Sequence, residues 1–200
     1  MKIDKYAKYD DLKQHEREGE DYVVILREDN LRIAVITPHG GGIEPGTVAI
    51  ADWVAGGEHT FYAFKGIKKK GNAALHITSN RFDEPEGVRI AKNAEVVVSI
   101  HGYHGNDDVV YIGGKNQDLK LKIMHMLNKA GFHAEISTKP GLRGQDPENI
   151  CNLCRTGEGV QLEISRGSRD RMFDSLGRRS WRKKTVLFFK FVDTLREALR

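Results

Sequence analysis

Short runs of apolar residues, rich in β-branched and aromatic side chains, recur along the whole chain. They lie at residues 22–26, 32–37, 60–64, 75–78, 95–100, 108–112, 132–136 and 159–165. Runs of this length between turn-forming residues are typical of β-strands, and the nearly uninterrupted E-V-V-V-S-I at 95–100 is typical of a central strand covered on both faces. The first two runs flank the turn signal E-D-N, so we predict that they pair as a hairpin.

Apolar residues between these runs follow helical spacing instead. The clearest case is 116–130, where the apolar residues share one face and Gly131 follows as a stop signal. We also predict helices at 44–54, 89–94 and 186–199. Because strands alternate with helices, the pattern predicts a single α/β domain over residues 1–200, with a mixed, mostly parallel sheet flanked by helices.

Residues with catalytic potential follow three of the predicted strands. His39 comes directly after V-I-T-P, and three glycines then lead to Glu44 at the start of a predicted helix. His101 follows V-V-S-I, and Glu163 follows V-Q-L in the last strand. In open α/β sheets, ligands bind beyond the carboxyl ends of the strands, so we expect these side chains to converge.

Each of these residues also has a structural interpretation. A single histidine at a strand end is more often a hydrogen-bonding loop residue than a metal ligand. Glu163 is more informative, because a carboxylate buried in an apolar strand is costly unless it is paired, protonated or functional. We interpret His76 and His104 as residues that support the site or the fold.

Taken together, the strand ends offer the parts of a zinc hydrolase. Catalytic zinc requires three protein ligands and one open position, and two imidazoles with a carboxylate form such a set. A separate carboxylate must transfer the proton, and an arginine or histidine should share the oxyanion charge. The glycines between His39 and Glu44 allow the tight turn that would aim both at one ion.

Composition and charge narrow the class of protein. The 39% apolar and 30% charged residues are ordinary for a soluble globular protein, and no run approaches the roughly 20 apolar residues of a membrane helix. The charged N-terminal segment lacks the apolar core of a secretory signal, so we expect a cytoplasmic protein, or one released by lysis or a nonstandard route. Residues 166–200 hold 11 Lys/Arg against 4 Asp/Glu, which indicates either a polyanionic partner or a solvated basic surface.

The two cysteines, Cys151 and Cys154, form a single C-N-L-C motif in a loop rich in proline and glycine. A zinc ribbon needs a second pair, which the chain lacks. We therefore expect no essential thiol chemistry, with a local disulfide as the alternative.

The order of these motifs resembles the zinc carboxypeptidase A fold group. The shared elements are His39 with Glu44, then N-R at 80–81, S-I-H-G-Y at 99–103 and L-E at 162–163. Within that group, P-H-G-G-G-I-E-P-G-T at 38–47, L-H-I-T-S with F-D-E-P, and G-V-Q-L-E-I-S at 159–165 resemble more closely the poly-γ-glutamate hydrolases of bacilli and their phages. The larger carboxypeptidases space their first pair as H-x-x-E, whereas four residues separate the pair here.

This resemblance implies a carboxypeptidase A-like fold and one Zn²⁺ ion held by His39, Glu44 and His101. It implies that Glu163 acts as general base and acid, with Arg81 beside the oxyanion. The implied reaction is endo-cleavage of γ-glutamyl amide bonds in poly-γ-glutamate by a monomer. Candidate contacts for this polyanion are Asn80, Tyr103, His104, Arg143, Arg155 and Arg166.

Two other functions remain open at this point. One is a zinc amidase or carboxypeptidase that acts on another acyl-amino acid or on a γ-glutamyl link of the cell wall. The other is a nucleic-acid-binding module built on the basic C-terminal region, which would bind in a salt-sensitive way. The sequence has no recognised nucleic-acid motif, so we expect neither a nucleic-acid partner nor a membrane partner.

Overall fold

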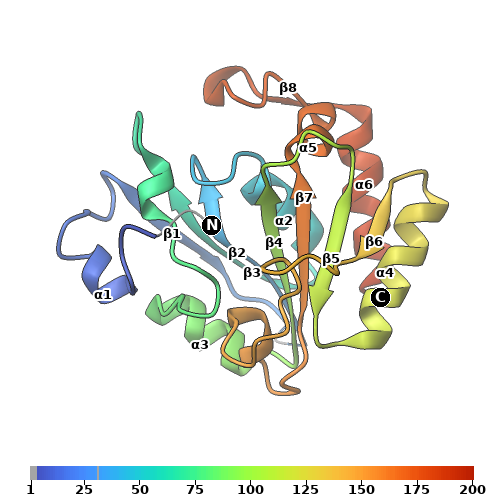
Figure 1. The fold of residues 1–200 in the computed structure, drawn as a ribbon, viewed down its shortest axis with the longest axis horizontal. Helices are drawn as coiled ribbons and strands as arrows, with labels where there is room; N and C mark the ends of the chain where they lie inside the picture. The colour runs from blue at the N-terminus through green and yellow to red at the C-terminus, as the bar shows by residue number, and fades with distance from the viewer. Residues whose placement is uncertain (1–3, 31) are drawn as a thin grey trace.

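A computed structural model describes residues 4–30 and 32–200 and contains a seven-stranded mixed sheet with helices on both faces (Figure 1). Residues 1–3 of the charged N-terminal segment lie outside the described part. The strand order is β1-β3-β2-β4-β7-β5-β6. The strands are β1 (Tyr22–Arg27), β2 (Ile33–Gly41), β3 (Thr60–Gly66), β4 (Val96–Tyr103), β5 (Val110–Gly114), β6 (Ala134–Ile136) and β7 (Val160–Ser165).

The centre of this sheet is parallel. Strands β3, β2, β4 and β7 run in the same direction, β1 pairs antiparallel with β3, and β5 pairs antiparallel with β7 and parallel with β6. The predicted mixed, mostly parallel sheet is therefore confirmed. Because the central strands are covered on both faces, β2 and β4 begin with nearly uninterrupted apolar runs, I-A-V-I and V-V-V-S-I, and this pattern made them recognisable in the sequence. Strand β7 instead alternates apolar and polar residues as V-Q-L-E-I-S.

The predicted hairpin of 22–26 with 32–37 is wrong. The E-D-N turn does reverse the chain, but β3 lies between β1 and β2 and pairs with both. Thr60 at the start of β3 binds this turn: its hydroxyl accepts from the Asp29 N–H (3.1 Å) and donates to the Asn30 carbonyl (3.3 Å). A turn signal predicts a reversal of the chain, but it does not predict that the two strands are neighbours.

The predicted strand at 75–78 is also wrong. Residues Asn72–Leu75 form the short 3₁₀ helix η1, and the chain then continues without regular structure. Leu75 and Ile77 are both fully buried. The alternation of apolar and polar residues therefore reflects a loop that buries every second side chain, and such a loop cannot be distinguished from a strand by periodicity alone.

The helices are α1 (Tyr9–Leu12), α2 (Thr47–Ala55), α3 (Pro85–Asn93), α4 (Gln117–Lys129), α5 (Arg166–Met172) and α6 (Val186–Ala198), with 3₁₀ turns η1, η2 (Ile150–Leu153) and η3 (Arg179–Trp181). A small hairpin of β8 (Phe173–Asp174) and β9 (Lys183–Lys184) follows α5. Among the described residues, no helix is long and apolar enough to cross a membrane.

The two faces of the sheet carry separate cores. Val35 of β2 belongs to the core formed with α2, α4 and α6, whereas its neighbour Ile36 belongs to the core formed with α1, α3 and η2. This division follows from the alternation of side chains along a strand. Helix α2 begins at Thr47, later than predicted, because Gly46 before it adopts φ +98°. Glu44 therefore lies in the turn that precedes the helix, and its side chain is available to the site.

Candidate metal centre and its pocket

Strands β2 and β4 extend further than the sequence predicted, so the candidate ligands His39 and His101 lie within the strands and not after them. Glu163 lies within β7, as predicted. The side chains are almost completely buried, with exposures of 2%, 2% and 7%. The register of β2 against β3 shifts between Thr37 and Gly40, so His39 lies at a strand irregularity, a feature that redirects side chains at many active sites.

The glycine loop returns the chain from His39 to Glu44. Gly41 has φ +70°, and a Cβ there would lie 2.3 Å from the Gly66 carbonyl oxygen, so only glycine allows the loop to pack against β3. The Glu44 N–H donates to the His39 carbonyl at 2.9 Å. The Thr47 hydroxyl donates to the Glu44 carbonyl at 2.9 Å. The backbone that carries both candidate ligands is thus fixed at each end.

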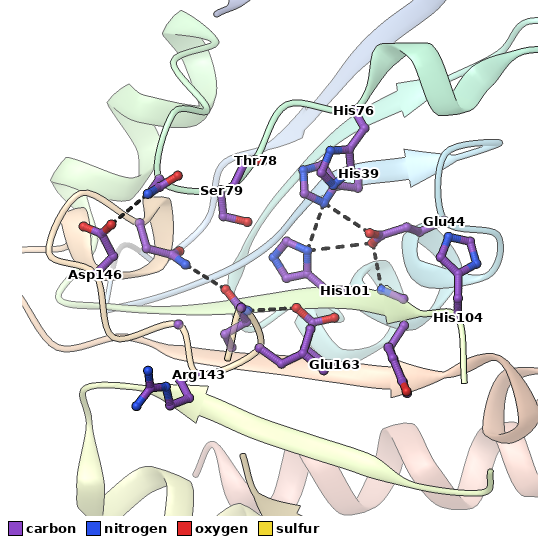
Figure 2. Close-up of a pocket in the computed structure, with 18 of the residues that line it drawn as sticks. His39, Glu44, His76, Thr78, Ser79, His101, His104, Arg143, Asp146 and Glu163 are labelled. Carbon is purple, nitrogen blue, oxygen red and sulfur yellow. Dashed lines mark hydrogen bonds and ion pairs between the residues drawn. The ribbon is translucent and has the colours of Figure 1, made fainter. Parts of the chain in front are cut away.

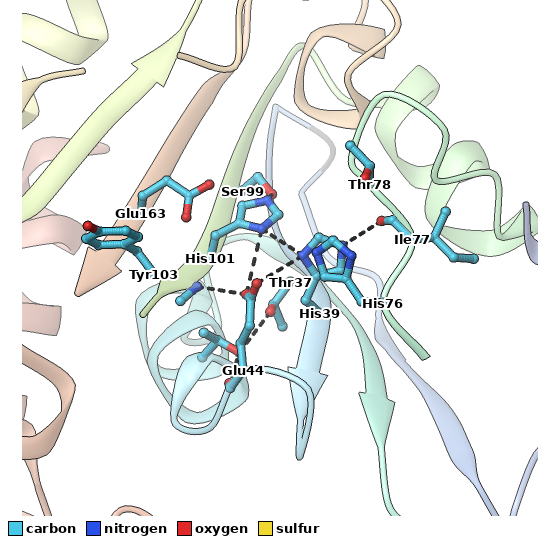
Figure 3. A network of polar contacts seen from close by, with 12 residues as sticks. Thr37, His39, Glu44, His76, Ile77, Thr78, Ser99, His101, Tyr103 and Glu163 are labelled. Atoms are coloured by element: carbon cyan, nitrogen blue, oxygen red, sulfur yellow. Dashed lines mark hydrogen bonds and ion pairs between the residues drawn. The ribbon is translucent and has the colours of Figure 1, made fainter. Parts of the chain in front are cut away.

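Three donor groups converge at this turn (Figure 3). Nδ1 of His39 lies 3.0 Å from Nδ1 of His101 and 3.3 Å from Oε1 of Glu44. Nδ1 of His101 lies 3.7 Å from Oε2 of Glu44. One atom from each side chain can be chosen so that all three lie within 4.8 Å of one another, which is close enough to bind a single ion.

The outer hydrogen bonds orient these donors toward one another. Nε2 of His39 lies 2.7 Å from the Ile77 carbonyl, which only accepts, so this nitrogen carries a proton and Nδ1 of the neutral ring presents a lone pair. Nε2 of His101 contacts the Ser99 hydroxyl at 2.8 Å, and the Gly102 N–H donates to Oε2 of Glu44 at 2.7 Å. When Nε2 of His101 donates to the Ser99 hydroxyl, two imidazole lone pairs and a carboxylate face one point, an arrangement that a cation or a shared proton must neutralise. This donor set fits Zn²⁺.

The electrostatics favour the metal-binding ionisation states of Glu44 and His101, but not that of His39. Burial opposes ionisation of Glu44, but His39, His101 and the Gly102 N–H outweigh it and hold the pKa of this carboxyl below its usual range. Burial, followed by the charge of His39, lowers the pKa of His101 to about 3. Burial also disfavours the charged form of His39, but Glu44 outweighs this and raises the pKa of His39. Protons therefore compete with a cation mainly at His39.

Glu163 lies beside the three candidate ligands, on the neighbouring strand β7. Two successive hydrogen bonds orient its side chain. Its Oε1 accepts from Nε2 of Gln161 at 2.8 Å, and Oε1 of Gln161 accepts from Nδ2 of Asn149 at 2.9 Å. Burial, followed by the charge of Glu44, raises the pKa of Glu163 well above its ordinary value, and the Gln161 bond partly offsets the increase. A buried carboxyl with a raised pKa holds a proton more readily than an exposed one, which suits it to proton transfer.

These residues line a pocket of about 750 Å³ (Figure 2). Of the candidate substrate contacts, Asn80, Tyr103, His104 and Arg143 line it. Arg143 is the one arginine or lysine in the lining among the described residues. Asn80 donates to Asp146 across the pocket wall at 2.7 Å.

The structure places Arg81, Arg155 and Arg166 outside this lining. Arg81 is 47% exposed and pairs with Asp4 at 2.8 Å. The Arg155 N–H bonds the Ala94 carbonyl just before β4 begins, at the opposite end of that strand from His101. Arg166 pairs with Asp170 one helical turn further on. The resemblance placed Arg81 beside the oxyanion, but the segment before it, at 75–78, is not the predicted strand, and its guanidinium pairs with Asp4.

Several further residues support the site, and most of them have no clear signal in the sequence. Asp4 accepts from Nδ1 of His76 (2.7 Å) and from the Thr78 N–H (2.8 Å), and the His76 ring packs against the His39 ring with centroids 4.0 Å apart and planes tilted by 31°. Gln161 had a readable signal, because it precedes Glu163 by two residues on the same strand face. Ser99 likewise precedes His101 by two residues on the same face of β4.

The cysteine motif lies in η2 and the residue after it. Cys151 and Cys154 are free, buried thiols, and burial raises the pKa of Cys151. A thiol with a raised pKa is a poor nucleophile, so Cys151 is unsuited to attack a substrate.

Two histidine nitrogens and a carboxylate oxygen converge at the carboxyl end of a mostly parallel sheet, and a further buried glutamate lies on the next strand. This arrangement is a candidate metal centre of the kind found in metallohydrolases. The sequence comparison gives the family. The model of the poly-gamma-glutamate hydrolase family matches residues 6–194, and the chain belongs to this family.

Individual relatives agree with that assignment. UPF0714 protein YndL of Bacillus subtilis (strain 168) is 37% identical over 171 residues, which are 85% of this chain and 67% of YndL. The structure of a bacteriophage poly-gamma-glutamate hydrolase matches with a TM-score of 0.92 and 34% identity, covering 98% of this chain and 97% of that one. A zinc-free apo structure of YndL matches with a TM-score of 0.89 and 34% identity over 98% of both chains. The predicted family and fold class are thereby confirmed.

Proposed function

We propose that the chain is a zinc-dependent hydrolase that cleaves γ-glutamyl amide bonds within poly-γ-glutamate. The observation that carries the proposal is the convergence of His39 Nδ1, His101 Nδ1 and the Glu44 carboxylate beside Glu163 in one pocket. Family membership and the bacteriophage hydrolase of the same fold support the substrate. A zinc-free form of YndL supports the choice of metal.

His39, Glu44 and His101 would hold one zinc ion and leave a position open to the pocket. Zinc at such a site supplies a Lewis acid that polarises a carbonyl and acidifies water. Glu163 accepts a proton from the attacking water at a carboxylate oxygen and then donates it to the leaving amide nitrogen. Its raised pKa suits both steps, since the group must lose and regain a proton in each turnover.

Arg143 would bind an α-carboxylate of the substrate. Each residue of poly-γ-glutamate keeps a free α-carboxylate, and a guanidinium binds such a group through two parallel hydrogen bonds. Asn80, Tyr103 and His104 line the same pocket and would contact the rest of the glutamyl unit. Exposed basic residues of the C-terminal segment, such as Lys183 and Lys184, would supply further positive charge for a long polyanion.

The test is the viscosity of purified high-molecular-weight poly-γ-glutamate. We expect the protein to lower it rapidly, a chelator to stop the loss, and added zinc to restore it. Endo-cleavage lowers viscosity long before much free glutamate appears, whereas a carboxypeptidase would release glutamate first. A protein that binds one zinc ion and leaves the polymer intact would exclude this substrate, and short γ-glutamyl and cell-wall peptides would then be assayed.

A further inference from the structure

Arg169 is buried directly behind the candidate metal centre. It lies in α5, the helix that follows β7, and only 2% of its surface is exposed. Each of its three guanidinium nitrogens donates to a backbone carbonyl: Nε to Ile164 at 3.0 Å, Nη1 to Pro45 at 2.7 Å and Nη2 to Tyr103 at 3.0 Å. Burial of a permanent charge against carbonyl groups alone is costly, so a local packing role is an insufficient explanation.

The three carbonyls belong to the three segments that carry the site. Ile164 follows Glu163 in β7, Pro45 follows Glu44, and Tyr103 ends β4 two residues after His101. A single planar group therefore fixes the relative positions of three backbones that are far apart in the sequence. Its positive charge also acts on Glu44 and Glu163.

Gly102 creates the space for this contact. A Cβ at residue 102 would lie 2.6 Å from Cζ of Arg169, so any side chain there would displace the guanidinium. The same residue donates its N–H to Oε2 of Glu44. The guanidinium thus lies against the residue that orients the carboxylate of the metal centre.

We propose that Arg169 is a positioning residue for the metal centre: by binding the Pro45, Tyr103 and Ile164 carbonyls it sets the distance and angle between Glu44, His101 and Glu163. It contacts neither the metal nor the substrate. This inference rests on the proposed function only in requiring zinc at His39, Glu44 and His101. Lysine cannot replace arginine in this role, because one ammonium group does not match three carbonyls arranged around a planar fork.

The experiment compares Arg169→Lys with wild type and with Arg171→Lys, the same exchange at an exposed position of the same helix. Zinc affinity is measured by competition with a chromophoric chelator, and ligand geometry by the visible absorption of Co²⁺ bound in place of zinc. We expect Arg169→Lys to weaken zinc binding roughly 10- to 100-fold and to change the Co²⁺ spectrum, as loss of groups that orient metal ligands does elsewhere. Arg171→Lys should match wild type in both measurements.

Kinetics and stability separate positioning from a purely structural role. Misplacement of Glu163 should lower kcat while KM stays within about twofold of wild type. A purely structural role would lower the melting temperature of the metal-free protein, yet leave the zinc affinity and Co²⁺ spectrum of the folded molecules unchanged. That result would overturn the proposal. If Arg169→Lys does not fold, Gly102→Ala displaces the guanidinium with its charge retained, and wild-type zinc affinity in that variant would overturn the proposal equally.

The two proposals can fail separately. Wild-type protein that binds no zinc would defeat both of them. Wild-type protein that binds zinc but leaves poly-γ-glutamate intact would defeat only the substrate assignment, and the comparison of zinc affinities would still decide the role of Arg169.

Discussion

Glu163 lies directly opposite His101 in the parallel ladder between β4 and β7. Residues that face each other in a ladder direct their side chains to the same face of the sheet. The register of two central strands therefore places the proposed proton carrier beside a proposed metal ligand without any help from a loop. A slip of one residue in that register would turn Glu163 to the other face, so the core packing that fixes the register also fixes the chemistry.

Replacement of Glu163 by Gln separates proton transfer from metal binding. The amide keeps the size and the polarity of the side chain but cannot accept the proton of water. We expect zinc content close to that of wild type and a loss of kcat of roughly 10²- to 10⁴-fold, the usual contribution of a general base. Metal analysis and polymer viscosity measure the two effects. Nearly full activity in a zinc-loaded Glu163→Gln protein would refute the role of Glu163.

Replacement of Gln161 by Leu should change the pH dependence of the reaction. Gln161 donates to Glu163, and this bond favours the ionised carboxylate, so its loss raises the pKa of Glu163 further. On acidification, Glu163 of the variant is therefore protonated, and loses its function as a base, at a higher pH than in wild type. We expect the acidic limb of kcat/KM to move upward in pH, with activity recovered in more alkaline buffer. An acidic limb that does not move would show that another group controls it.

Replacement of Ser99 by Ala tests the hydrogen bond behind His101. Without the hydroxyl, Nε2 of His101 loses its partner at 2.8 Å and the ring is less firmly oriented. We expect zinc affinity to fall about 10-fold or more, as for other groups that orient ligand histidines. Ser137→Ala is the matched control, because the Ser137 hydroxyl is buried without a hydrogen-bond partner among the described residues. Equal zinc affinity in the two variants would argue against the role of Ser99.

Local pattern was enough to predict most of the sheet and the helices. The run at 95–100 and the helix at 116–130 correspond to β4 and α4 within a few residues. Pairing was less predictable, because the hairpin signal at 28–30 carries no information about β3, which enters between β1 and β2 from later in the chain. Strand lengths were underestimated, since the polar ligands at the strand ends resembled loop residues.

The site was predictable to the extent that its residues follow strands. His39, His101 and Glu163 were found because a polar group after an apolar run is visible in the sequence. The role of Arg169 was not predicted, because its hydrogen bond to the Pro45 carbonyl joins residues 124 positions apart. In the sequence, Arg169 is one of many arginines and lysines in a basic segment. Arg81 was expected beside the oxyanion from the resemblance, whereas it lies outside the pocket lining and pairs with Asp4.

Glu16 provides a test of stability that does not depend on the site. Its carboxylate is buried and accepts from the Tyr6 hydroxyl (2.6 Å), Lys5 (3.2 Å) and Lys68. Burial opposes its charge, but the bonds from Lys68, Tyr6 and Lys5 outweigh it and lower the pKa from 4.5 to about 2. A lowered folded-state pKa stabilises the fold above pH 4.5, and this contribution disappears as the pH falls toward 2.

We therefore expect Glu16→Gln to lower the free energy of unfolding at pH 7 by about 2–3 kcal/mol, and by much less near pH 2. Urea unfolding at several pH values measures the difference. If the difference in the free energy of unfolding between wild type and variant stays constant with pH, ionisation of Glu16 does not cause that difference.

Replacement of Arg143 by Gln tests substrate binding at the edge of the pocket. Arg143 is exposed and lines the same pocket as Glu163, so its guanidinium can reach a carboxylate of a bound polymer without contacting the metal ligands. We expect KM for poly-γ-glutamate to rise roughly 3- to 10-fold with kcat little changed, and Arg143→Lys to recover part of the loss. The difference from wild type should shrink at high salt, because screening weakens the attraction between exposed charges.

Arg155→Gln removes the same charge outside the pocket lining and serves as the control. A similar rise in KM in both variants would mean that overall charge, and not a contact in the pocket, attracts the substrate.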